Sequence, residues 1–469
     1  MLVGGLGGGS GKTIVSLGLI RFLKNKGLKV RPFKKGPDYI DAAWLSIAAK
    51  NACCNLDPFF LDKETIISLF AYKSKNHDLA IIEGNRGIFD GLDVNGSCST
   101  TYLAKILDVP VILVVDCTKV TRTVAALILG CNSLERDFKV QGVIFNRVAG
   151  PRHRCILTAS VEKYTDVKVI GAIPKLKNDP IPERYMGLIS HREYECEENI
   201  EFLSTIVSEN IDIEQALSLA QNTNKIFVTK KIYPEEKIVQ GINIGVVKDS
   251  SLWFYYDENL ELLQRLGANI VEFSLIEDPL PPCELHGLYL GGGFPETQVQ
   301  GLSKNESMRR YVFDMAHKGM PIFAECGGLM YLCKELKVKG QIYPLAGVFP
   351  YTVEIHKRPQ GHGYTEVVVE RDNPYFKRGT SFLGHEFHYS KCVGDVKNLS
   401  CLKVIRGTAL GAGCDGLLYK NTFASYNHIH ALHIPSWGMN FVKAAEIFKN
   451  FLDNWKSNTG SCKTITAQY

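Results

Sequence analysis

The sequence lacks the features that define several large classes of protein. It has no apolar run of about 18 residues or more, which a membrane-spanning helix needs, and no basic segment before an apolar stretch at its start, as a signal peptide would have. None of its 14 cysteines forms a C-x-x-C pair, and their scatter is typical of free thiols. The net charge is only +5, and the excess is spread along the chain. We therefore expect a cytoplasmic protein whose partners are neither membranes nor nucleic acids.

The composition is that of a globular protein with more than one domain. The chain has 469 residues, enough for two to four domains, and no internal repeat or low-complexity tract. In its first half, short apolar runs alternate with helical patterns, such as the one at residues 13–26. Such continuous apolar runs are typical of parallel strands buried on both faces. We expect strands at residues 1–4, 30–33, 79–82, 111–115, 143–145 and 169–170.

A polar and charged stretch interrupts this alternation and predicts a linker at residues 226–241. A second region follows, with strands expected at residues 242–247, 288–290, 321–324 and 366–369. The sequence thus predicts an α/β fold of two domains, residues 1–225 and 242–455, followed by a tail at 456–469. The first strand is very short, which leaves open a start codon upstream of Met1.

A glycine-rich segment at residues 4–13, GGLGGGSGKT, lies between an expected strand and an expected helix. Glycines let backbone N–H groups surround phosphate oxygens, the lysine reaches the outer phosphates, and the threonine can ligate Mg²⁺. The usual spacing fails because Leu6 stands where the first glycine belongs, so the loop resembles that of dethiobiotin synthetase and its relatives. A flexible glycine linker would not explain Lys-Thr at the start of a helix. The residues expected to bind ATP are Gly7, Gly8, Gly9, Ser10, Gly11, Lys12 and Thr13, with Mg²⁺ on Thr13.

The loop after the second expected strand carries further candidates, because ligands bind at the carboxyl ends of parallel strands. Lys34 is placed to neutralise a transferred phosphoryl group or a substrate carboxylate, which makes it a candidate catalytic residue. Asp38 is a candidate for Mg²⁺ and substrate, and Tyr39 and Ile40 are candidates for packing against a flat apolar macrocycle. An ordinary Gly-Pro-Asp turn is the structural alternative.

An acidic residue follows another strand at residues 79–82. A carboxylate at the end of a buried strand opposite a phosphate loop is the usual second anchor for Mg²⁺, so we expect Glu83 to hold the metal. Asp90 lies further along the same loop and is expected to contact the metal or orient substrate. A solvated loop carboxylate is the alternative for both.

The second region contains a candidate cysteine nucleophile. Cys326 lies between an expected strand and a helix start and is flanked by small residues, the arrangement of a nucleophile elbow. The helix N-terminus is expected to lower the thiol pKa. The N–H of Gly327 is expected to bind an oxyanion together with that of Gly292 or Gly293, which follow another strand.

The base for this cysteine has to be a histidine from elsewhere in the chain. His428 is the first candidate, His430 is the second, and His433 is expected to be structural. The cysteine and histidine together resemble a class I glutamine amidotransferase domain. In many such domains a glutamate two residues after the histidine orients it. Here that position is His430, so we expect an incomplete triad.

Further motifs resemble those of the cobyrinic acid a,c-diamide synthase family, from about residue 3 to residue 450. They lie at residues 33–41 (FKKGPDYID), 55–58 (NLDP), 254–260 (FYYDENL) and 384–390 (GHEFHYS). The resemblance implies a dethiobiotin synthetase-like ATPase domain fused to a class I amidotransferase domain. It also implies an enzyme in which Cys326 frees ammonia from glutamine through a thioester. MgATP converts a carboxylate of a tetrapyrrole to an acyl phosphate, and ammonia displaces phosphate, at the a and c acetates in turn.

Some residues depart from the family pattern, and the sequence also allows other interpretations of the chain. Asn85 and Arg86 replace a small or apolar pair, Tyr185 replaces a histidine, and Ala431 stands where an aromatic residue is common. A relative that amidates another tetrapyrrole, such as nickel-sirohydrochlorin, is the main alternative. Cobyric acid synthase, a partitioning-type ATPase and a pseudoenzyme fit the motifs less well. The sequence does not indicate the oligomeric state.

Overall fold

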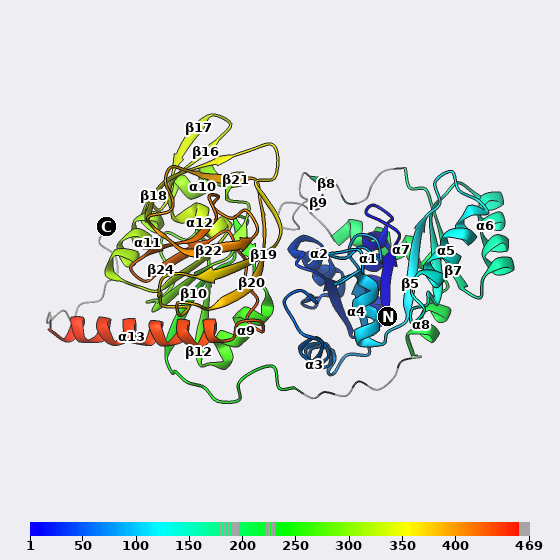
Figure 1. Cartoon of the computed structure of the whole chain (residues 1–469), viewed down its shortest axis with the longest axis horizontal. Helices are drawn as coiled ribbons and strands as arrows, with labels where there is room; N and C mark the ends of the chain where they lie inside the picture. Colours follow the sequence, from blue (N-terminus) through cyan, green and yellow to red (C-terminus); the bar gives the residue numbers. More distant parts are fainter. Residues whose placement is uncertain are drawn as a thin grey trace. The chain divides into compact units, whose positions relative to one another are not determined.

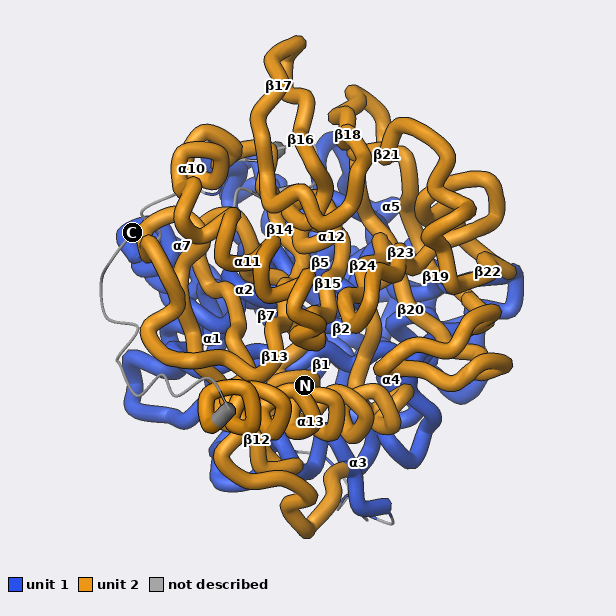
Figure 2. The backbone as a smooth tube through the Cα atoms, turned by 90° about the vertical axis from the view of Figure 1, so that its left-hand side faces the viewer, with its two compact units in different colours: residues 1–232 blue, residues 233–469 orange. Residues whose placement is uncertain are grey.

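The computed structural model describes residues 1–177, 197–221 and 230–458, with residues 181, 183–184, 187–188, 223, 226 and 228 between them. The departure at Tyr185 and the end of the expected tail lie outside the described residues. The chain divides into two compact units, Met1–Ile232 and Tyr233–Tyr469 (Figure 2). The division falls within the stretch where the sequence predicts a linker.

Unit 1 is built on a parallel sheet of seven strands in the order β3-β2-β4-β1-β5-β6-β7 (Figure 1). The sheet strands are β1 (Leu2–Gly5), β2 (Val30–Lys35), β3 (Cys54–Leu56), β4 (Leu79–Glu83), β5 (Val111–Asp116), β6 (Gly142–Val148) and β7 (Lys168–Pro174); β8 (Glu183–Arg184) and β9 (Gly187–Leu188) form a separate pair. Every residue of β1 and β2 is buried, including three charged residues of β2: Arg31, Lys34 and Lys35.

Helices connect the strands of unit 1 and pack on its sheet. They are α1 (Lys12–Asn25), α2 (Tyr39–Ala49), α3 (Lys63–Ser74), α4 (Thr100–Leu107), α5 (Thr123–Leu134), α6 (Pro151–Tyr164), α7 (Glu197–Asn210) and α8 (Ile213–Gln221). Aspartate side chains cap α2 and α3: Asp38 accepts from the N–H of Asp41, and Asp62 from that of Thr65. Arg21 of α1 joins α1 to α2 and α7, because its guanidinium donates to the carbonyl of Ala48 and pairs with two glutamates of α7.

Unit 2 contains a nine-stranded sheet whose first five strands, β12-β10-β13-β15-β24, are parallel. The remaining four, β23-β22-β19-β20, are antiparallel. The expected strand at residues 366–369 is therefore real but belongs to an antiparallel extension rather than to further strand–helix alternation. The sheet strands are β10 (Ile242–Val247), β12 (Ala268–Phe273), β13 (Gly287–Leu290), β15 (Ile322–Glu325), β19 (Gly361–Val369), β20 (Ser381–His388), β22 (Ser400–Arg406), β23 (Cys414–Tyr419) and β24 (Thr422–Ser425).

Two smaller sheets and several helices complete unit 2. The strands are β11 (Leu252–Phe254) paired with β14 (Gly292–Gly293), and β16 (Cys333–Val338), β17 (Gln341–Pro344), β18 (Phe349–Ile355) and β21 (Ser390–Val393) in a four-stranded sheet. The helices are α9 (Asp257–Arg265), α10 (Val299–Lys304), α11 (Glu306–Lys318), α12 (Gly327–Leu332) and α13 (Ser436–Asn458), with a 3-10 turn at Pro295–Thr297. The sequence predicts a tail from residue 456 onward, but α13 continues to Asn458 and so includes the first three residues of that stretch.

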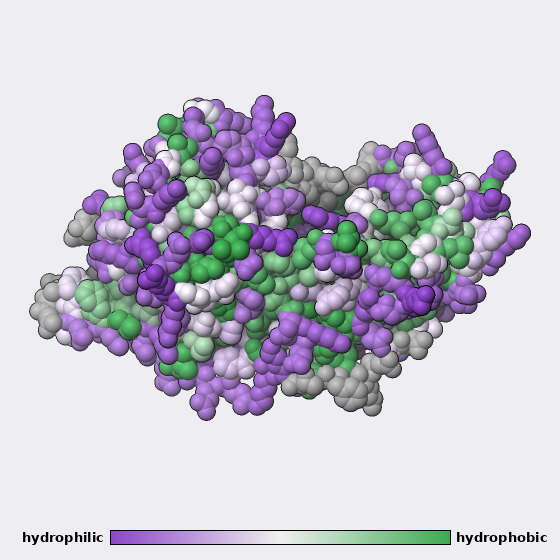
Figure 3. Space-filling model, in the orientation of Figure 1, coloured by the Kyte–Doolittle hydropathy of each residue, from purple (hydrophilic) through white to green (hydrophobic). Residues whose placement is uncertain are grey.

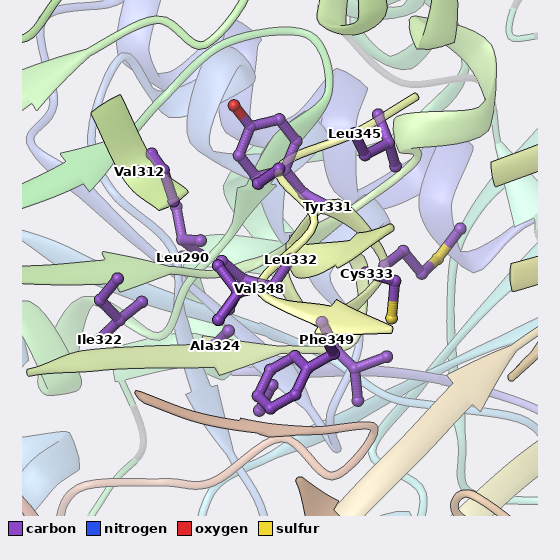
Figure 4. Close-up of a cluster of buried hydrophobic side chains, with 14 of the residues drawn as sticks. Leu290, Val312, Ile322, Ala324, Tyr331, Leu332, Cys333, Leu345, Val348 and Phe349 are labelled. Carbon is purple, nitrogen blue, oxygen red and sulfur yellow. The ribbon is translucent and has the colours of Figure 1, made fainter. Parts of the chain in front are cut away.

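A hydrophobic core surrounds the strand and helix that flank the candidate nucleophile. Leu290 of β13, Val312 of α11, and Ile322 and Ala324 of β15 lie in one cluster with the residues of α12 (Figure 4). Leu332 is fully buried there. Close packing of this kind fixes the strand–helix turn on both sides, which a reactive side chain on that turn requires.

The face of the molecule seen in Figure 3 has mixed hydropathy. Hydrophilic residues cover much of the face seen in Figure 3, with hydrophobic residues between them. In the part of the chain that the structure describes, no helix is both long and apolar enough to cross a bilayer.

Candidate active sites

In unit 1 the glycine-rich loop joins β1 to α1 at the carboxyl end of β1. Gly9 and Gly11 have φ of 70° and 97°, a region that favours glycine. A Cβ at Gly11 would come within 2.1 Å of Nδ2 of Asn146, which donates to the carbonyl of Ser10 at 3.0 Å. A Cβ at Gly7, Gly8 or Gly9 would meet no atom within 4 Å, so this part of the loop is open. The loop is thus held at Ser10–Gly11 and leaves space where phosphates are expected.

Lys12 lies across this loop. Its Nζ donates to the carbonyl of Gly7 at 2.9 Å and to Oγ of Ser10 at 3.5 Å. Burial, and then the nearby charge of Lys34, lower the pKa of Lys12. Because a neighbouring anion would favour the charged form, the lysine is suited to a phosphate group at this position.

Lys34 lies at the centre of a buried cluster of charges. Its Nζ is 2.6 Å from Oδ2 of Asp41 and 2.7 Å from Oε1 of Glu83. Burial by itself would lower the pKa of Lys34, but the charges of Asp41 and Glu83 outweigh it and raise the pKa. Lys34 is therefore a fixed cation, as the sequence interpretation requires. Its two carboxylate partners are in place before any substrate binds.

Asp38 and Asp41 crowd each other beside this lysine. Burial, and then the charge of Asp41, raise the pKa of Asp38 to about 7. Asp41 behaves oppositely, because the charge of Lys34 outweighs burial and lowers its pKa. The pair thus holds one firmly ionised carboxylate and one that a cation would help to ionise. Asp41 was not among the candidate site residues. Its position three residues after Asp38 on the first turn of α2 is the signal that would have found it.

Two of the residues expected to hold Mg²⁺, Thr13 and Glu83, are in direct contact. Oγ1 of Thr13 donates to Oε1 of Glu83 at 2.9 Å, so the loop threonine and the strand-end carboxylate meet. Oε2 of Glu83 is buried and accepts no hydrogen bond, an orphaned oxygen that a cation would satisfy. Among the residues that the structure describes, no group of three or more His, Cys, Asp and Glu has the geometry of a metal site by itself. The donors fit an ion that takes most of its ligands from phosphate and water, as Mg²⁺ does.

The other candidates in unit 1 have mainly local contacts. Asp90 accepts from the backbone N–H of Gly87 at 2.8 Å and thereby closes its own loop. Tyr39 and Ile40 are 9% and 7% exposed, so little of either side chain is open to a macrocycle in this conformation. These two remain predictions that nothing in unit 1 by itself supports.

In unit 2 Cys326 sits on a strained turn, as expected. Its φ is 46°, in the left-handed region that residues with a Cβ rarely adopt, and it joins β15 directly to α12. The turn is held because the N–H of Cys326 donates to the carbonyl of Ser425 at 2.7 Å. Close contacts with Gly293 and Leu290 leave no room for a side chain at Gly327 and Gly328. The strained strand–turn–helix that the sequence predicts at Cys326 is present.

The expected lowering of the thiol pKa is not found. Burial, and then the charge of Glu296, raise the pKa of Cys326. The helix that follows has only six residues, Gly327–Leu332, and its effect does not offset the loss of solvent. Burial thus favours the protonated thiol, so Cys326 would need a base to act as a nucleophile.

The candidate oxyanion glycines and the base meet at this turn. A Cβ at Gly327 would lie 2.9 Å from the backbone nitrogen of Gly293. A Cβ at Gly292 would lie 2.4 Å from Cε1 and 3.2 Å from Nε2 of His428. Gly292 therefore has to be glycine for the imidazole to approach this close. Gly327, on the turn of Cys326, thus lies beside Gly293, and Gly292 lies beside His428.

His428 is held by a strand that sequence reasoning left without a role. His385 of β20 exchanges two backbone hydrogen bonds with His428, at 2.8 and 3.2 Å, and the two rings stack at 4.8 Å. The carbonyl of Phe387, two residues further on, lies 4.0 Å from Sγ of Cys326. The GHEFHYS motif thus forms a wall of the cysteine site. The motif itself was the signal, but no local pattern could reveal that it lies beside His428.

The other two histidines have separate surroundings. Nε2 of His430 lies 3.7 Å from Oε2 of Glu258, and Nε2 of His433 accepts from the N–H of Leu383 at 2.9 Å. His433 thus has the structural contact that the sequence predicts. A carboxylate that sequence reasoning missed, Glu325, lies beside His428: its Oε2 is 3.8 Å from Nδ1 of the imidazole.

The chain is similar to known proteins over nearly its whole length. Residues 1–178 match the AAA domain model, and residues 243–435 match the CobB/CobQ-like glutamine amidotransferase domain model. Cobyrinate a,c-diamide synthase of Magnetococcus marinus is 38% identical, covering 91% of this chain and 93% of its own. The proteins of the same name from Caldanaerobacter subterraneus subsp. tengcongensis and Archaeoglobus fulgidus are 37% and 36% identical. They cover 97% and 95% of this chain, and 98% and 97% of their own.

Proposed function

Because the chain belongs to the cobyrinate a,c-diamide synthase family, we propose that it amidates the a and c acetate groups of cobyrinic acid, with ATP and glutamine as co-substrates. The single observation that carries this proposal is the coexistence of two equipped sites in one chain. Unit 1 has an open phosphate loop facing a buried Lys34–Glu83 pair, and unit 2 has a strained cysteine beside a histidine. Neither site alone accounts for an amide ligase.

The chemistry proposed for unit 1 follows from the poor reactivity of a carboxylate. A carboxylate oxygen attacks the γ-phosphorus of ATP, the bond to ADP breaks, and an acyl phosphate forms. Backbone N–H groups of the glycine-rich loop and Lys12 hold the phosphates, and Lys34 neutralises charge that builds on the transferred group. Thr13, Glu83 and Asp38 would hold Mg²⁺, which, when bound, offsets the charge of the phosphate oxygens. Ammonia then adds to the acyl carbon, and inorganic phosphate leaves with its electron pair.

The chemistry proposed for unit 2 supplies that ammonia. His428 takes the proton of Cys326 as Sγ attacks the carboxamide carbon of glutamine. The N–H groups of Gly293 and Gly327 stabilise the oxyanion. The imidazolium returns the proton to the leaving nitrogen, so that ammonia departs and a thioester remains. Water hydrolyses the thioester to glutamate and restores the thiol.

Product mass spectrometry tests the substrate. The protein is incubated with MgATP and glutamine, and with either cobyrinic acid or nickel-sirohydrochlorin. Two amidations of cobyrinic acid are expected. Turnover of the nickel compound alone would replace this substrate by the other tetrapyrrole, and no amidation of either would reject both.

The roles of the two sites are tested by Cys326→Ser. This variant is expected to lose glutamine-dependent amidation and to keep amidation with added ammonium, because unit 1 needs only ammonia. Loss of both activities in a folded variant would contradict the assignment of Cys326 as the source of ammonia.

A further inference from the structure

A carboxylate directly before the nucleophile lies in contact with the loop that carries the base. Glu325 ends β15, is 1% exposed, and points its Oε2 toward Nδ1 of His428 at 3.8 Å. We propose that Glu325 is a positioning residue for glutamine hydrolysis: it holds the His428 loop in place and stabilises the imidazolium that forms when His428 takes the thiol proton. This inference rests on the proposed glutaminase function of unit 2.

Glu325 binds the backbone of the loop that carries His428. Its Oε1 accepts from the N–H of Ile429, the residue after His428, at 2.9 Å. Glu325 is the last residue of β15 and immediately precedes Cys326. The position of the base relative to Cys326 is therefore fixed through one buried hydrogen bond to a charged acceptor, which is among the stronger kinds.

Other side chains also hold Glu325 and the loop that carries His428. The hydroxyl of Tyr289 donates to Oε2 of Glu325 at 2.9 Å and accepts from Nδ2 of Asn259 at 3.0 Å. Asn259 also donates to the carbonyl of Ile429 and accepts from the N–H of Ala431, at 3.0 and 2.7 Å. Both oxygens of Glu325 and both sides of the loop are thus held in one buried network.

The same network reaches Gly291, which directly precedes the candidate oxyanion glycines Gly292 and Gly293. The hydroxyl of Tyr255 accepts from the N–H of Gly291 at 2.8 Å and donates to the carbonyl of Tyr289 at 3.3 Å. Tyr255 and Asn259 both belong to the FYYDENL motif, whose role the sequence did not reveal. The motif therefore supports the base loop with one residue and the oxyanion loop with another, and Tyr289 and Glu325 lie between them.

The charge of Glu325 also acts on the imidazole of His428. At 3.8 Å the Glu325–His428 contact is longer than a hydrogen bond, so it acts through electrostatic attraction within a buried site. Because the attraction exists only once the imidazole is protonated, it favours the state that follows proton transfer from Cys326. His385, which stacks on His428, has its pKa lowered by burial and is therefore neutral, and His430 lies beside another carboxylate, Glu258. Glu325 is thus the carboxylate placed to compensate His428.

The experiment compares Glu325→Gln with wild type in the full-length protein. Glutamine keeps the size and one acceptor of the side chain and removes its charge. We expect kcat for glutamine hydrolysis to fall by about ten- to a thousandfold, with KM for glutamine changed less than about twofold. Ammonium-dependent amidation is expected to stay at the wild-type rate. Glu325→Asp, which keeps the charge, is expected to recover part of kcat.

Matched controls separate this role from a general effect of losing a carboxylate. Glu335→Gln changes a half-buried glutamate of the same unit that accepts from Oγ1 of Thr352, and it should leave both activities unchanged. Glu258→Gln tests the other buried carboxylate near the histidines. If Glu258→Gln lowers kcat and Glu325→Gln does not, the assignment to Glu325 is overturned. Equal loss of glutamine- and ammonium-dependent activity in Glu325→Gln would also overturn it, because the defect would then be structural.

A second variant covers the case in which Glu325→Gln does not fold. Tyr289→Phe keeps the charge of Glu325 and removes the donor to its Oε2. It is expected to lower kcat for glutamine hydrolysis by about three- to thirtyfold. Wild-type glutamine hydrolysis in this variant would contradict the network. If wild type itself hydrolyses no glutamine, the proposed function of unit 2 fails, which distinguishes that outcome from failure of Glu325 alone.

Discussion

Asp38 should destabilise the ligand-free protein at neutral pH, and replacing it should therefore increase stability. Burial and the charge of Asp41 raise its pKa from 3.8 to about 7. The protonated carboxyl is thus favoured in the folded chain, so its contribution to stability is present at low pH and is lost as the pH rises from about 4 through about 7. At pH 8 the carboxylate is ionised in both states, and the folded state is less stable by about 2–4 kcal/mol.

The substitution Asp38→Asn removes this charge and keeps the helix cap. Asparagine caps helices about as well as aspartate, so the hydrogen bond from the N–H of Asp41 is retained. We expect Asp38→Asn to increase the free energy of unfolding by about 2–4 kcal/mol at pH 8 and by close to zero at pH 4. The variant should also lose MgATP-dependent amidation, because an amide is a poorer ligand for Mg²⁺ than a carboxylate.

Hydrogen exchange measured by mass spectrometry on peptides from α1, β2 and α2 gives the stability of this region without assuming that both units unfold together. Wild type and variant are compared at each of four pH values from 4 to 8, without nucleotide or metal. Asp62→Asn is the matched control, because Asp62 also caps a helix but has its pKa lowered to about 2 by the N–H of Thr65. Its replacement should slightly destabilise the protein above pH 4. A difference for Asp38→Asn that does not change with pH, or destabilisation at pH 8, would refute the reasoning.

Three further predictions concern other parts of the chain. Glu83→Gln should lower the rate of amidation at least about a hundredfold while leaving glutamine hydrolysis in unit 2 intact, measured by separate ADP and glutamate assays; an unchanged amidation rate would contradict its role. Gly384→Ala places a Cβ 1.9 Å from Oδ1 of Asn427, so it should destabilise unit 2 by about 1–3 kcal/mol. A melting temperature equal to that of wild type would contradict this packing. Arg21→Met removes the buried side-chain donor to the carbonyl of Ala48 in α2 and the cation between two glutamates of α7, and should destabilise unit 1 by about 1–3 kcal/mol in urea unfolding; a change below about 0.5 kcal/mol would mean that the residue is not needed there.

The parts of the fold and sites that could be predicted from sequence are those encoded by neighbouring residues. Local sequence predicts the conformation of β1 and β5 from their apolar runs. It does the same for the glycine-rich loop and for the turn at Cys326, which small residues flank. Family membership and the ligase class, which the motifs predicted in combination, are confirmed by relatives that match nearly the whole chain. The assignments of individual site residues remain predictions, although Thr13, Glu83 and Lys34 do meet in the structure.

The parts that could not be predicted depend on contacts between distant residues. The antiparallel half of the sheet in unit 2 follows from pairing of short strands, whose partners no local pattern specifies. Glu325 was overlooked because the search for an acid followed the spacing after His428, whereas the carboxylate comes from 103 positions earlier in the chain. The thiol pKa was predicted with the wrong sign because the sequence indicates a helix N-terminus but not the burial that outweighs it.

The backbone strain at Cys326 has an evolutionary consequence. A residue with a Cβ at φ of 46° costs about 1 kcal/mol relative to glycine. Exchange of the cysteine for glycine would remove that strain and leave the surrounding core intact, so the inactive protein should fold at least as well as the active one. Stability therefore gives no protection against loss of this nucleophile. In a lineage that can take up free ammonia, only continued selection for glutamine use would keep a cysteine at position 326.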